Sequence, residues 1–240
     1  YTTNSEPMKE EVDIQWLDEV DSTNNEALRN ISGIDNLSVL AALHQTSGRG
    51  QRGNSWSARP GENLTFSLVM KFGDGAYPPL KASRQFPISR SVTLGVLDYL
   101  EYEGIVATVK WPNDIYWHDK KIAGILIENV LSGSTFSRAI IGMGLNINQK
   151  NFYSDAPNPV SLYQITGRTY NIEKILDEFT EAFGKRYTDT FTNSSDRIHK
   201  EYIAALYRND GVYPFYSDGN IFHASIADVE LDGHLLLSTE

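Results

Sequence analysis

A glycine-rich, basic loop restricts the fold of this chain more than any other segment. Residues 48–53 read Gly-Arg-Gly-Gln-Arg-Gly, which matches the G-x-G-x-x-G pattern of dinucleotide-binding βαβ units. In those units a helix begins at the glycines, but here Pro60 and Gly61 leave no room for a helix before the apolar run at 64–72. Despite the match, the absence of room for this helix argues against a Rossmann fold. Taken alone, the segment fits a solvated surface loop as well as a loop that lies against an anion.

Composition limits the classes of function. The 240 residues carry a formal net charge of −10, which argues against nonspecific nucleic-acid binding, because that binding depends on Lys and Arg side chains meeting phosphates. The absence of cysteine excludes thiolate nucleophiles, thiolate metal ligands and disulfides. The five histidines have no zinc-binding spacing, so we expect no metal site. No signal peptide or membrane-spanning run is visible, and we expect a soluble, cytoplasmic protein.

The order of apolar patterns predicts an α+β core. Thr23 and Glu26 stand in the T-x-x-E relation of a capping box at the start of the first helix. The expected strands are 12–20, 38–44, 64–72, 105–111, 113–118, 121–131 and 138–147, and the expected helices are 25–30, 81–103, 172–191 and 195–207.

The pattern changes near residue 209, where short alternating runs and hairpin signals such as Asp218-Gly219 and Asp232-Gly233 begin. We therefore expect two domains, residues 1–208 and a small all-β unit at 209–240. The chain stops at Glu240, soon after a strand-like run of leucines, so the small unit could lack its last strand.

A second segment, Lys-Trp-Pro-Asn-Asp at 110–114, carries polar chemistry. Pro112 cannot donate to a sheet ladder, so it indicates an edge or a bulge that redirects its neighbours. We expect Lys110, Asn113 and Asp114 to face one shared space.

The run that follows, Lys-Ile-Ala-Gly-Ile-Leu at 121–126, adds a lysine and a glycine. Lys121 is either a solvated side chain beside a hairpin turn or part of the same space, and Gly124 indicates close approach of a ligand to the backbone. Arginines, lysines and the aromatic plane of Trp56 would suit a nucleotide. No paired carboxylates and no G-x-S-x-G elbow are present, which favours phosphoryl or nucleotidyl transfer by positioning and charge neutralisation.

These segments together resemble the motifs of the biotin protein ligases, in the family's order over residues 12–148. The matching segments are Asp21-Ser22-Thr23-Asn24, Gln45-Thr46-Ser47-Gly48-Arg49-Gly50, Asn54-Ser55-Trp56, Lys110-Trp111-Pro112-Asn113-Asp114, Lys121-Ile122-Ala123-Gly124-Ile125-Leu126 and Gly142-Met143-Gly144-Leu145-Asn146.

The resemblance implies a mixed β-sheet with helices on one side, of the class II aminoacyl-tRNA-synthetase-like kind, and a small SH3-like β-barrel at the C-terminus. It also implies an ATP-dependent activity in two half-reactions. Biotin first attacks the α-phosphate of MgATP, giving biotinyl-5′-AMP and pyrophosphate. A lysine of a biotin carboxyl carrier protein then takes the biotinyl group and AMP is released. ATP with Mg²⁺ and biotin are substrates, and no permanently bound cofactor is implied.

The resemblance implies a role for each residue of this chain that matches a site residue of the family. The residues that resemble the biotin site are Ser22, Thr23, Asn24, Gln45, Gly48, Arg49, Gly50, Lys121 and Gly124. Those that resemble the nucleotide side are Arg52, Trp56, Lys110, Asn113, Asp114 and Asn146. Lys121, Arg49 and Arg52 are the expected catalytic residues. Many members have arginine where this chain has Gln51, so either Arg52 supplies that charge or the adenylate is held less tightly.

Two alternatives and three further expectations accompany the resemblance. A lipoate or octanoate ligase or transferase would share the fold, and a noncatalytic biotin sensor is a candidate of another class. About eleven residues precede the first strand, too few for the winged-helix DNA-binding domain of some members, which indicates a monofunctional ligase that binds no DNA. We expect no membrane partner, and a homodimer through the catalytic-domain sheet is a further expectation.

Overall fold

A mixed β-sheet forms the centre of the protein. The structure is a computed structural model that describes residues 12–73, 79–153, 156–192 and 195–239. Within these residues the sheet has the order β1-β2-β3-β8-β7-β6-β5, with β4 beside β8, and only the β1–β2 pair is parallel. The strands are β1 (Asp13–Val20), β2 (Ser38–Gln45), β3 (Leu64–Lys71), β4 (Leu80–Lys81), β5 (Thr108–Lys110), β6 (Asp114–Trp117), β7 (Lys120–Ser132) and β8 (Thr135–Leu145).

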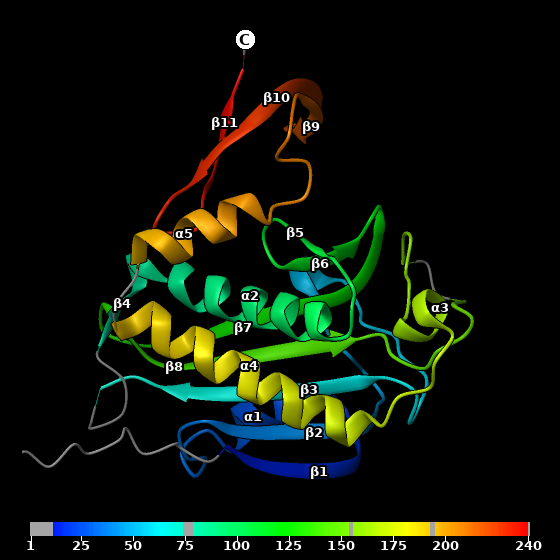
Figure 1. Ribbon diagram of the computed structural model, residues 1–240. Helices are drawn as coiled ribbons and strands as arrows, with labels where there is room; N and C mark the ends of the chain where they lie inside the picture. Colours follow the sequence, from blue (N-terminus) through cyan, green and yellow to red (C-terminus); the bar gives the residue numbers. More distant parts are fainter. Residues whose placement is uncertain (1–11, 74–78, 154–155, 193–194, 240) are drawn as a thin grey trace, which may run out of the picture.

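Three helices cover one face of this sheet, as Figure 1 shows: α2 (Phe86–Tyr102), α4 (Ile172–Thr192) and α5 (Ser195–Ala204). Alternation along the strands explains the arrangement, because successive side chains point to opposite faces. Leu68 and Met70 of β3 join the large core under these helices. Val69, between them, instead packs with Ala27 of the short helix α1 (Thr23–Arg29) on the other face. The main helices therefore lie on one side, as expected, and among the described residues α1 is the helix that packs against the opposite face of the central strands.

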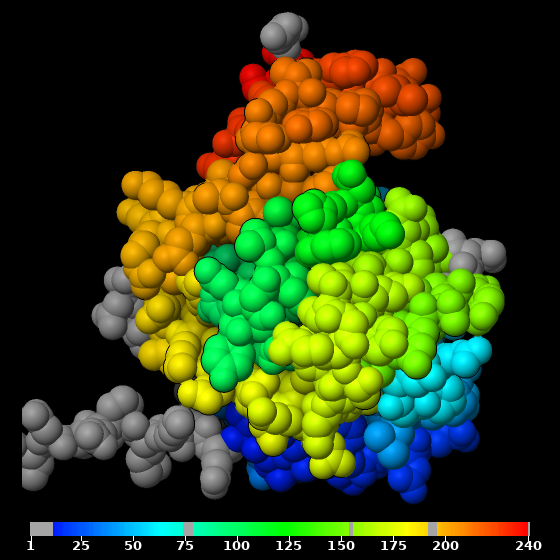
Figure 2. Space-filling model, turned by 45° about the vertical axis from the view of Figure 1, so that its right-hand side comes forward, coloured from blue at the N-terminus to red at the C-terminus, as the bar shows by residue number. Residues whose placement is uncertain are grey.

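The C-terminal residues form a second, three-stranded antiparallel sheet in the order β11-β10-β9. Its strands are β9 (Tyr213–Ser217), β10 (Asn220–Val229) and β11 (Leu235–Ser238). Figure 2 shows this sheet and the segment before it as a lobe that projects from the main body. This arrangement agrees with the small SH3-like β unit expected at the C-terminus.

Several local expectations need correction. Ser22, not Thr23, caps α1: its extended backbone (φ −155°) directs its Oγ to accept a hydrogen bond from the Asn25 amide at 3.4 Å, and Thr23 is already helical. The strand expected at 105–111 is reduced to three residues: residues 105–107 join no strand, and Trp111 and Pro112 already lie in the turn between β5 and β6.

Two helices also differ from expectation. The helix expected at 81–103 begins at Phe86, since a strand pair (β4) and the 3-10 turn η2 (Ala82–Arg84) precede it. A five-residue helix, α3 (Leu162–Thr166), was not foreseen, although Ser161 and Gln164 form a complete capping box at its start. None of the helices in the described part of the chain has the length and apolar character to cross a membrane.

Candidate active site

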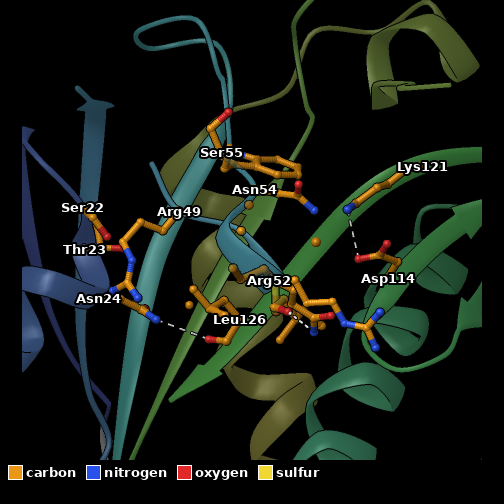
Figure 3. Close-up of a pocket in the computed structure, with 18 of the residues that line it drawn as sticks. Ser22, Thr23, Asn24, Arg49, Arg52, Asn54, Ser55, Asp114, Lys121 and Leu126 are labelled. Carbon is orange, nitrogen blue, oxygen red and sulfur yellow. Dashed lines mark hydrogen bonds and ion pairs between the residues drawn. The ribbon is translucent and has the colours of Figure 1, made fainter. Parts of the chain in front are cut away.

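A cavity of about 260 Å³ lies on the α1 side of the main sheet. Residues from α1, from the glycine-rich loop, from the β5–β6 turn and from β6, β7 and β8 line it. In Figure 3, Ser22, Thr23 and Asn24 lie at one side of the cavity, and Lys121 and Asp114 lie at the other. The lining residues are Ser22, Thr23, Asn24, Gln45, Arg49, Gly50, Gln51, Arg52, Asn54, Ser55, Trp56, Trp111, Pro112, Asp114, Lys121, Gly124, Ile125, Leu126, Gly142, Met143 and Gly144.

The glycine-rich loop is a narrow hairpin that folds over this cavity. The Trp56 amide donates to the Gly48 carbonyl at 2.8 Å, and the Gly50 amide donates to the Asn54 carbonyl at 2.7 Å. A Cβ at Gly48 would lie only 2.3 Å from the Trp56 carbonyl oxygen, so the close approach of the two arms requires glycine there. The tip is the 3-10 turn η1 (Gln51–Gly53).

A floor of glycines supports the Trp56 indole. Gly124 of β7 and Gly144 of β8 are directly paired. A Cβ at Gly144 would lie 2.1 Å from the indole, and one at Gly124 would lie 3.2 Å from it. The close approach predicted at Gly124 is thus an approach to Trp56 and to the Lys121 side chain. The indole Nε1 is buried without a hydrogen-bond partner among the described residues.

Buried polar groups form the end of the cavity next to α1. The Thr23 amide donates to Gln45 Oε1 at 2.8 Å. The hydroxyl of Ser67 on β3, a residue that was not identified from the sequence, hydrogen-bonds to Thr23 Oγ1 at 2.7 Å and to the side-chain oxygen Oδ1 of Asn24. The hydroxyls of Ser22 and Thr23 and the amide group of Gln45 keep hydrogen-bonding capacity. This end of the cavity can therefore receive a polar, uncharged group.

A carboxylate holds the segment that leads into α1. The Asp21 side chain accepts from Arg29 at 2.7 and 2.9 Å and from Asn25 at 3.0 Å. Chiefly the Arg29 guanidinium, then the Asn25 amide, keeps the pKa of the Asp21 carboxyl well below its ordinary value. Asp21 therefore stays ionised just before the N-terminus of α1, where a negative charge is favourable.

Arg49 is positioned by a carboxylate from the sheet. Its guanidinium donates to Glu128 at 2.7 and 3.1 Å and to Asn25 Oδ1 at 2.8 Å. Glu128 also accepts from the side-chain Nδ2 of Asn24 at 2.9 Å. Glu128 was not identified from the sequence, and its position on the α1 face of β7 is the only signal that points to it. Glu128 therefore links the loop, through Arg49, and α1, through Asn24, to strand β7 of the sheet.

Lys121 and Asp114 form an ion pair of 3.0 Å across the β6–β7 ladder, and both side chains are about 30% exposed or less. The Lys121 ammonium also lies 5.8 Å from the centre of the Trp56 ring. The lysine is therefore part of the cavity and is not a solvated side chain beside the hairpin turn. Its charge lies where an anion in the cavity would meet it.

Gln51 and Arg52 differ in what they contact. Gln51 turns toward the sheet, where its Nε2 donates to the Ile125 carbonyl at 3.2 Å. Arg52 adopts a left-handed backbone conformation (φ 54°), is exposed and lines the cavity. Within the described part of the chain it has no carboxylate partner in an ion pair. Arg52 is thus available to a ligand, whereas Arg49 is held by Glu128.

Some residues assigned from the resemblance do not line this cavity. The Lys110 ammonium donates to the Tyr116 hydroxyl at 3.2 Å, and Asn113 accepts from the Ser89 hydroxyl on α2. Asn146 bonds through its backbone to Ile122. Gly48 is not among the lining residues, but its carbonyl accepts the hydrogen bond from the Trp56 amide that closes the loop. Of the fifteen residues assigned from the sequence, eleven do line it: Ser22, Thr23, Asn24, Gln45, Arg49, Gly50, Arg52, Trp56, Asp114, Lys121 and Gly124.

The chain belongs to the biotin/lipoate A/B protein ligase family, whose model matches residues 16–146. It is 30% identical over 198 residues to the biotin–[acetyl-CoA-carboxylase] ligase of Paracoccus denitrificans, covering 80% of each chain. It is 31% identical over 158 residues to the bifunctional ligase/repressor BirA of Bacillus subtilis, covering 65% of this chain but 47% of that protein.

Solved structures share the fold. The biotin protein ligase from Aquifex aeolicus in complex with biotin and ATP superimposes with a TM-score of 0.78 at 24% identity, over 95% of this chain and 92% of that one. The Leishmania major biotin protein ligase in complex with biotinyl-5-AMP gives a TM-score of 0.59 at 22% identity, over 94% of each chain. The mixed sheet and its helices are therefore those of this family.

Proposed function

We propose that this protein joins biotin to a lysine of a biotin carboxyl carrier protein, using ATP and passing through biotinyl-5′-AMP. The observation that carries the proposal is the single cavity that unites a buried polar end with a cluster of cations. An acid and a nucleotide that react with each other need such a pairing of sites in one space. The relatives named as biotin ligases support the same substrates.

The polar end of the cavity favours biotin over lipoate. Ser22, Thr23 and Asn24 are each 3% exposed or less, and burying polar groups is costly unless a partner satisfies them. A ureido ring offers both donors and acceptors to such a wall. The dithiolane ring of lipoate or the chain of octanoate offers neither, so these ligands would leave the wall groups unpaired.

The cations explain how the first half-reaction would proceed. Biotin and ATP both carry negative charge, so their mutual repulsion must be offset before the carboxylate can reach the α-phosphate. Lys121 of β7 and Arg52 of the loop both line the cavity. Their fixed charges would stabilise the extra negative charge that develops as pyrophosphate leaves. The nucleophiles belong to the substrates, which fits a chain without cysteine.

Magnesium would enter with ATP. Among the described lining residues Asp114 is the one carboxylate, and Lys121 already pairs with it. The chain thus offers few oxygen ligands for a resident Mg²⁺, an ion that often keeps several waters and is held largely by substrate phosphates. Mg²⁺ would accordingly bind as part of the MgATP substrate.

Transfer of labelled biotin to an isolated carrier domain tests the proposal. We expect ATP-dependent labelling of one carrier lysine, and none when ATP is omitted or when the carrier lysine is replaced by arginine. A parallel reaction with labelled lipoate should give little product. Efficient transfer of lipoate and not biotin would establish the alternative substrate, and tight biotin binding without transfer would indicate a sensor.

A further inference from the structure

The turn between β10 and β11 contacts the wall of the cavity. Trp111, which lines the cavity, donates its indole Nε1–H to the carbonyl of Gly233 at 2.9 Å. These residues are separated by 122 positions. The same turn accepts hydrogen bonds from the Phe86 amide at 3.3 Å and from the Gln85 side chain at 3.2 Å, at the start of α2. The small sheet is therefore bonded both to the catalytic core and to one residue of the cavity.

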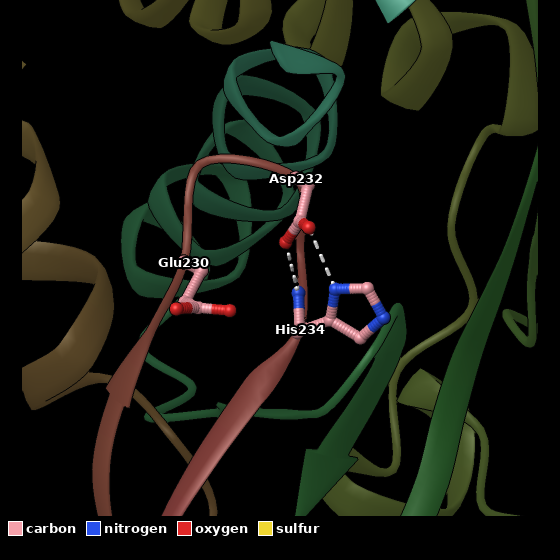
Figure 4. A group of neighbouring side chains, drawn as sticks. All are labelled: Glu230, Asp232 and His234. Atoms are coloured by element: carbon pink, nitrogen blue, oxygen red, sulfur yellow. Dashed lines mark hydrogen bonds and ion pairs between the residues drawn. The ribbon is translucent and has the colours of Figure 1, made fainter. Parts of the chain in front are cut away.

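Bonds within the turn fix the direction of the Gly233 carbonyl. The Asp232 carboxylate accepts from the His234 amide at 3.0 Å and from the His234 ring at 2.8 Å (Figure 4). The Gly233 amide donates to the Glu230 carbonyl at 2.9 Å, and Gly233 has a φ of +95°, which suits glycine. Glu230, Asp232 and His234 lie close enough together to hold a metal ion, but Asp232 and His234 already satisfy each other, and their pairing is explained by the turn.

A second contact lies beside the same turn. The His199 ring on α5 contacts the Asp228 carboxylate at 2.6 Å, and Asp228 lies near the end of β10, two residues before the turn. The hairpin is thus attached to the catalytic domain through the turn itself and through the strand residue next to it, and the turn also reaches a residue that lines the cavity.

We propose that the β10–β11 turn, residues 230–234, is a positioning element for the cavity, acting through the hydrogen bond from Trp111 to Gly233. The turn holds the Trp111–Pro112 wall in place, and loosening it lets that wall move. The kinetic part of this inference rests on the proposed function, since a change in the KM for ATP or biotin is its readout. The structural part of the inference does not rest on the proposed function.

Two variants and a matched control test the proposal. Asp232→Ala removes the carboxylate that fixes the turn, and Trp111→Phe removes only the indole donor while keeping an aromatic ring. Asp218→Ala is the control, because Asp218 occupies the equivalent turn between β9 and β10 and its side chain bonds only to its neighbour Ser217 among the contacts described.

The direct readout is the indole N–H signal of Trp111 in a ¹⁵N NMR spectrum, assigned by its loss in Trp111→Phe. A hydrogen bond contributes about 0.5–1.5 kcal/mol, which corresponds to about a 2–10-fold change. We expect Asp232→Ala to shift this signal and to accelerate its hydrogen exchange about 2–10-fold, with the Trp16 and Trp117 signals unchanged. Asp218→Ala should leave all of them in place. An unaltered Trp111 signal in Asp232→Ala would overturn the proposal.

Kinetics supply the second readout. Asp232→Ala should raise the KM for at least one of ATP and biotin about 2–10-fold, and in the Trp111→Phe background it should have no further effect. Effects that multiply independently would show that the turn does not act through Trp111. If Asp232→Ala fails to fold, Gln85→Ala removes the other side-chain contact with the turn and is judged by the same signal. If the wild type shows no biotin-dependent reaction, the proposed function fails, whereas the NMR result still decides the positioning role.

Discussion

Replacement of Gly144 by alanine tests whether the glycine floor defines the active cavity. The added methyl carbon would lie 2.1 Å from Cε2 of the Trp56 indole, 2.4 Å from Nε1 and 2.5 Å from Cζ2. Gly144 belongs to β8 in the middle of the main sheet and cannot move away. The indole must therefore retreat by about 1 Å, and the cavity changes shape.

The expected loss is large for the reaction and modest for stability. A misplacement of about 1 Å in a site that works by positioning can cost about 10²-fold in rate. Overpacking of this kind costs about 1–3 kcal/mol of folding free energy, and less where a loop can relax. We expect kcat/KM for biotin in pyrophosphate exchange to fall about 10²-fold, while thermal unfolding remains cooperative.

Controls separate the clash from a general effect of alanine. Gly184→Ala lies on the exposed side of α4 with no atom within 4 Å of the new methyl, and it should raise stability by about 0.5–1 kcal/mol and leave activity unchanged. In a Trp56→Ala background, Gly144→Ala should cost little more, because the methyl enters vacated space. Normal activity of Gly144→Ala, or an equal loss in both backgrounds, would show that contact between this methyl group and Trp56 does not control the cavity.

Two further predictions concern charge. Arg52→Ala should impair biotin-dependent pyrophosphate exchange more than Gln51→Ala, because Arg52 is exposed in the cavity and Gln51 bonds to the sheet backbone; equal or reversed losses would contradict the assignment. Burial raises the pKa of the Asp228 carboxyl, but hydrogen bonds from His199 and Val229 outweigh burial and lower it below its ordinary value of 3.8. Asp228→Asn should therefore lower the free energy of unfolding by up to about 1 kcal/mol at pH 7, and denaturant titrations should show this difference shrinking as the pH falls below about 4, whereas a constant difference would contradict it.

The sequence was most informative about features that depend on the local backbone, such as close packing at a glycine or the period of a helix. The glycines of the loop, Gly124 and the helical stripe of α4 each reflect a local requirement for space or period. The stripe does lie on a helix, whereas the close approach at Gly124 is made by the Trp56 and Lys121 side chains and not by a ligand. The cap of α1 was missed by one position, because Ser22 and Thr23 are both good capping residues and only the backbone angles distinguish them.

Contacts between distant segments could not be predicted from the sequence. Glu128 bonds to Arg49 across 79 positions, and Trp111 reaches Gly233 across 122. The first pair depends on strand register, because Glu128 lies on β7 and a shift of one residue would turn its side chain to the other face. Trp111 and Gly233 lie in turns between strands, so their contact depends on how the small sheet meets the main body. Lys110 shows the same limit: its residue type suits a phosphate, but its side chain reaches the Tyr116 hydroxyl instead of the cavity.

We propose that this cavity activates biotin as an adenylate with the charge of Lys121. Biotin-dependent exchange of labelled pyrophosphate into ATP, measured for the wild type and for Lys121→Gln, tests it most directly. We expect exchange by the wild type with biotin and about a 10²–10³-fold lower rate in the variant, with an unchanged melting temperature. No exchange by the wild type, or full exchange by Lys121→Gln, would contradict it.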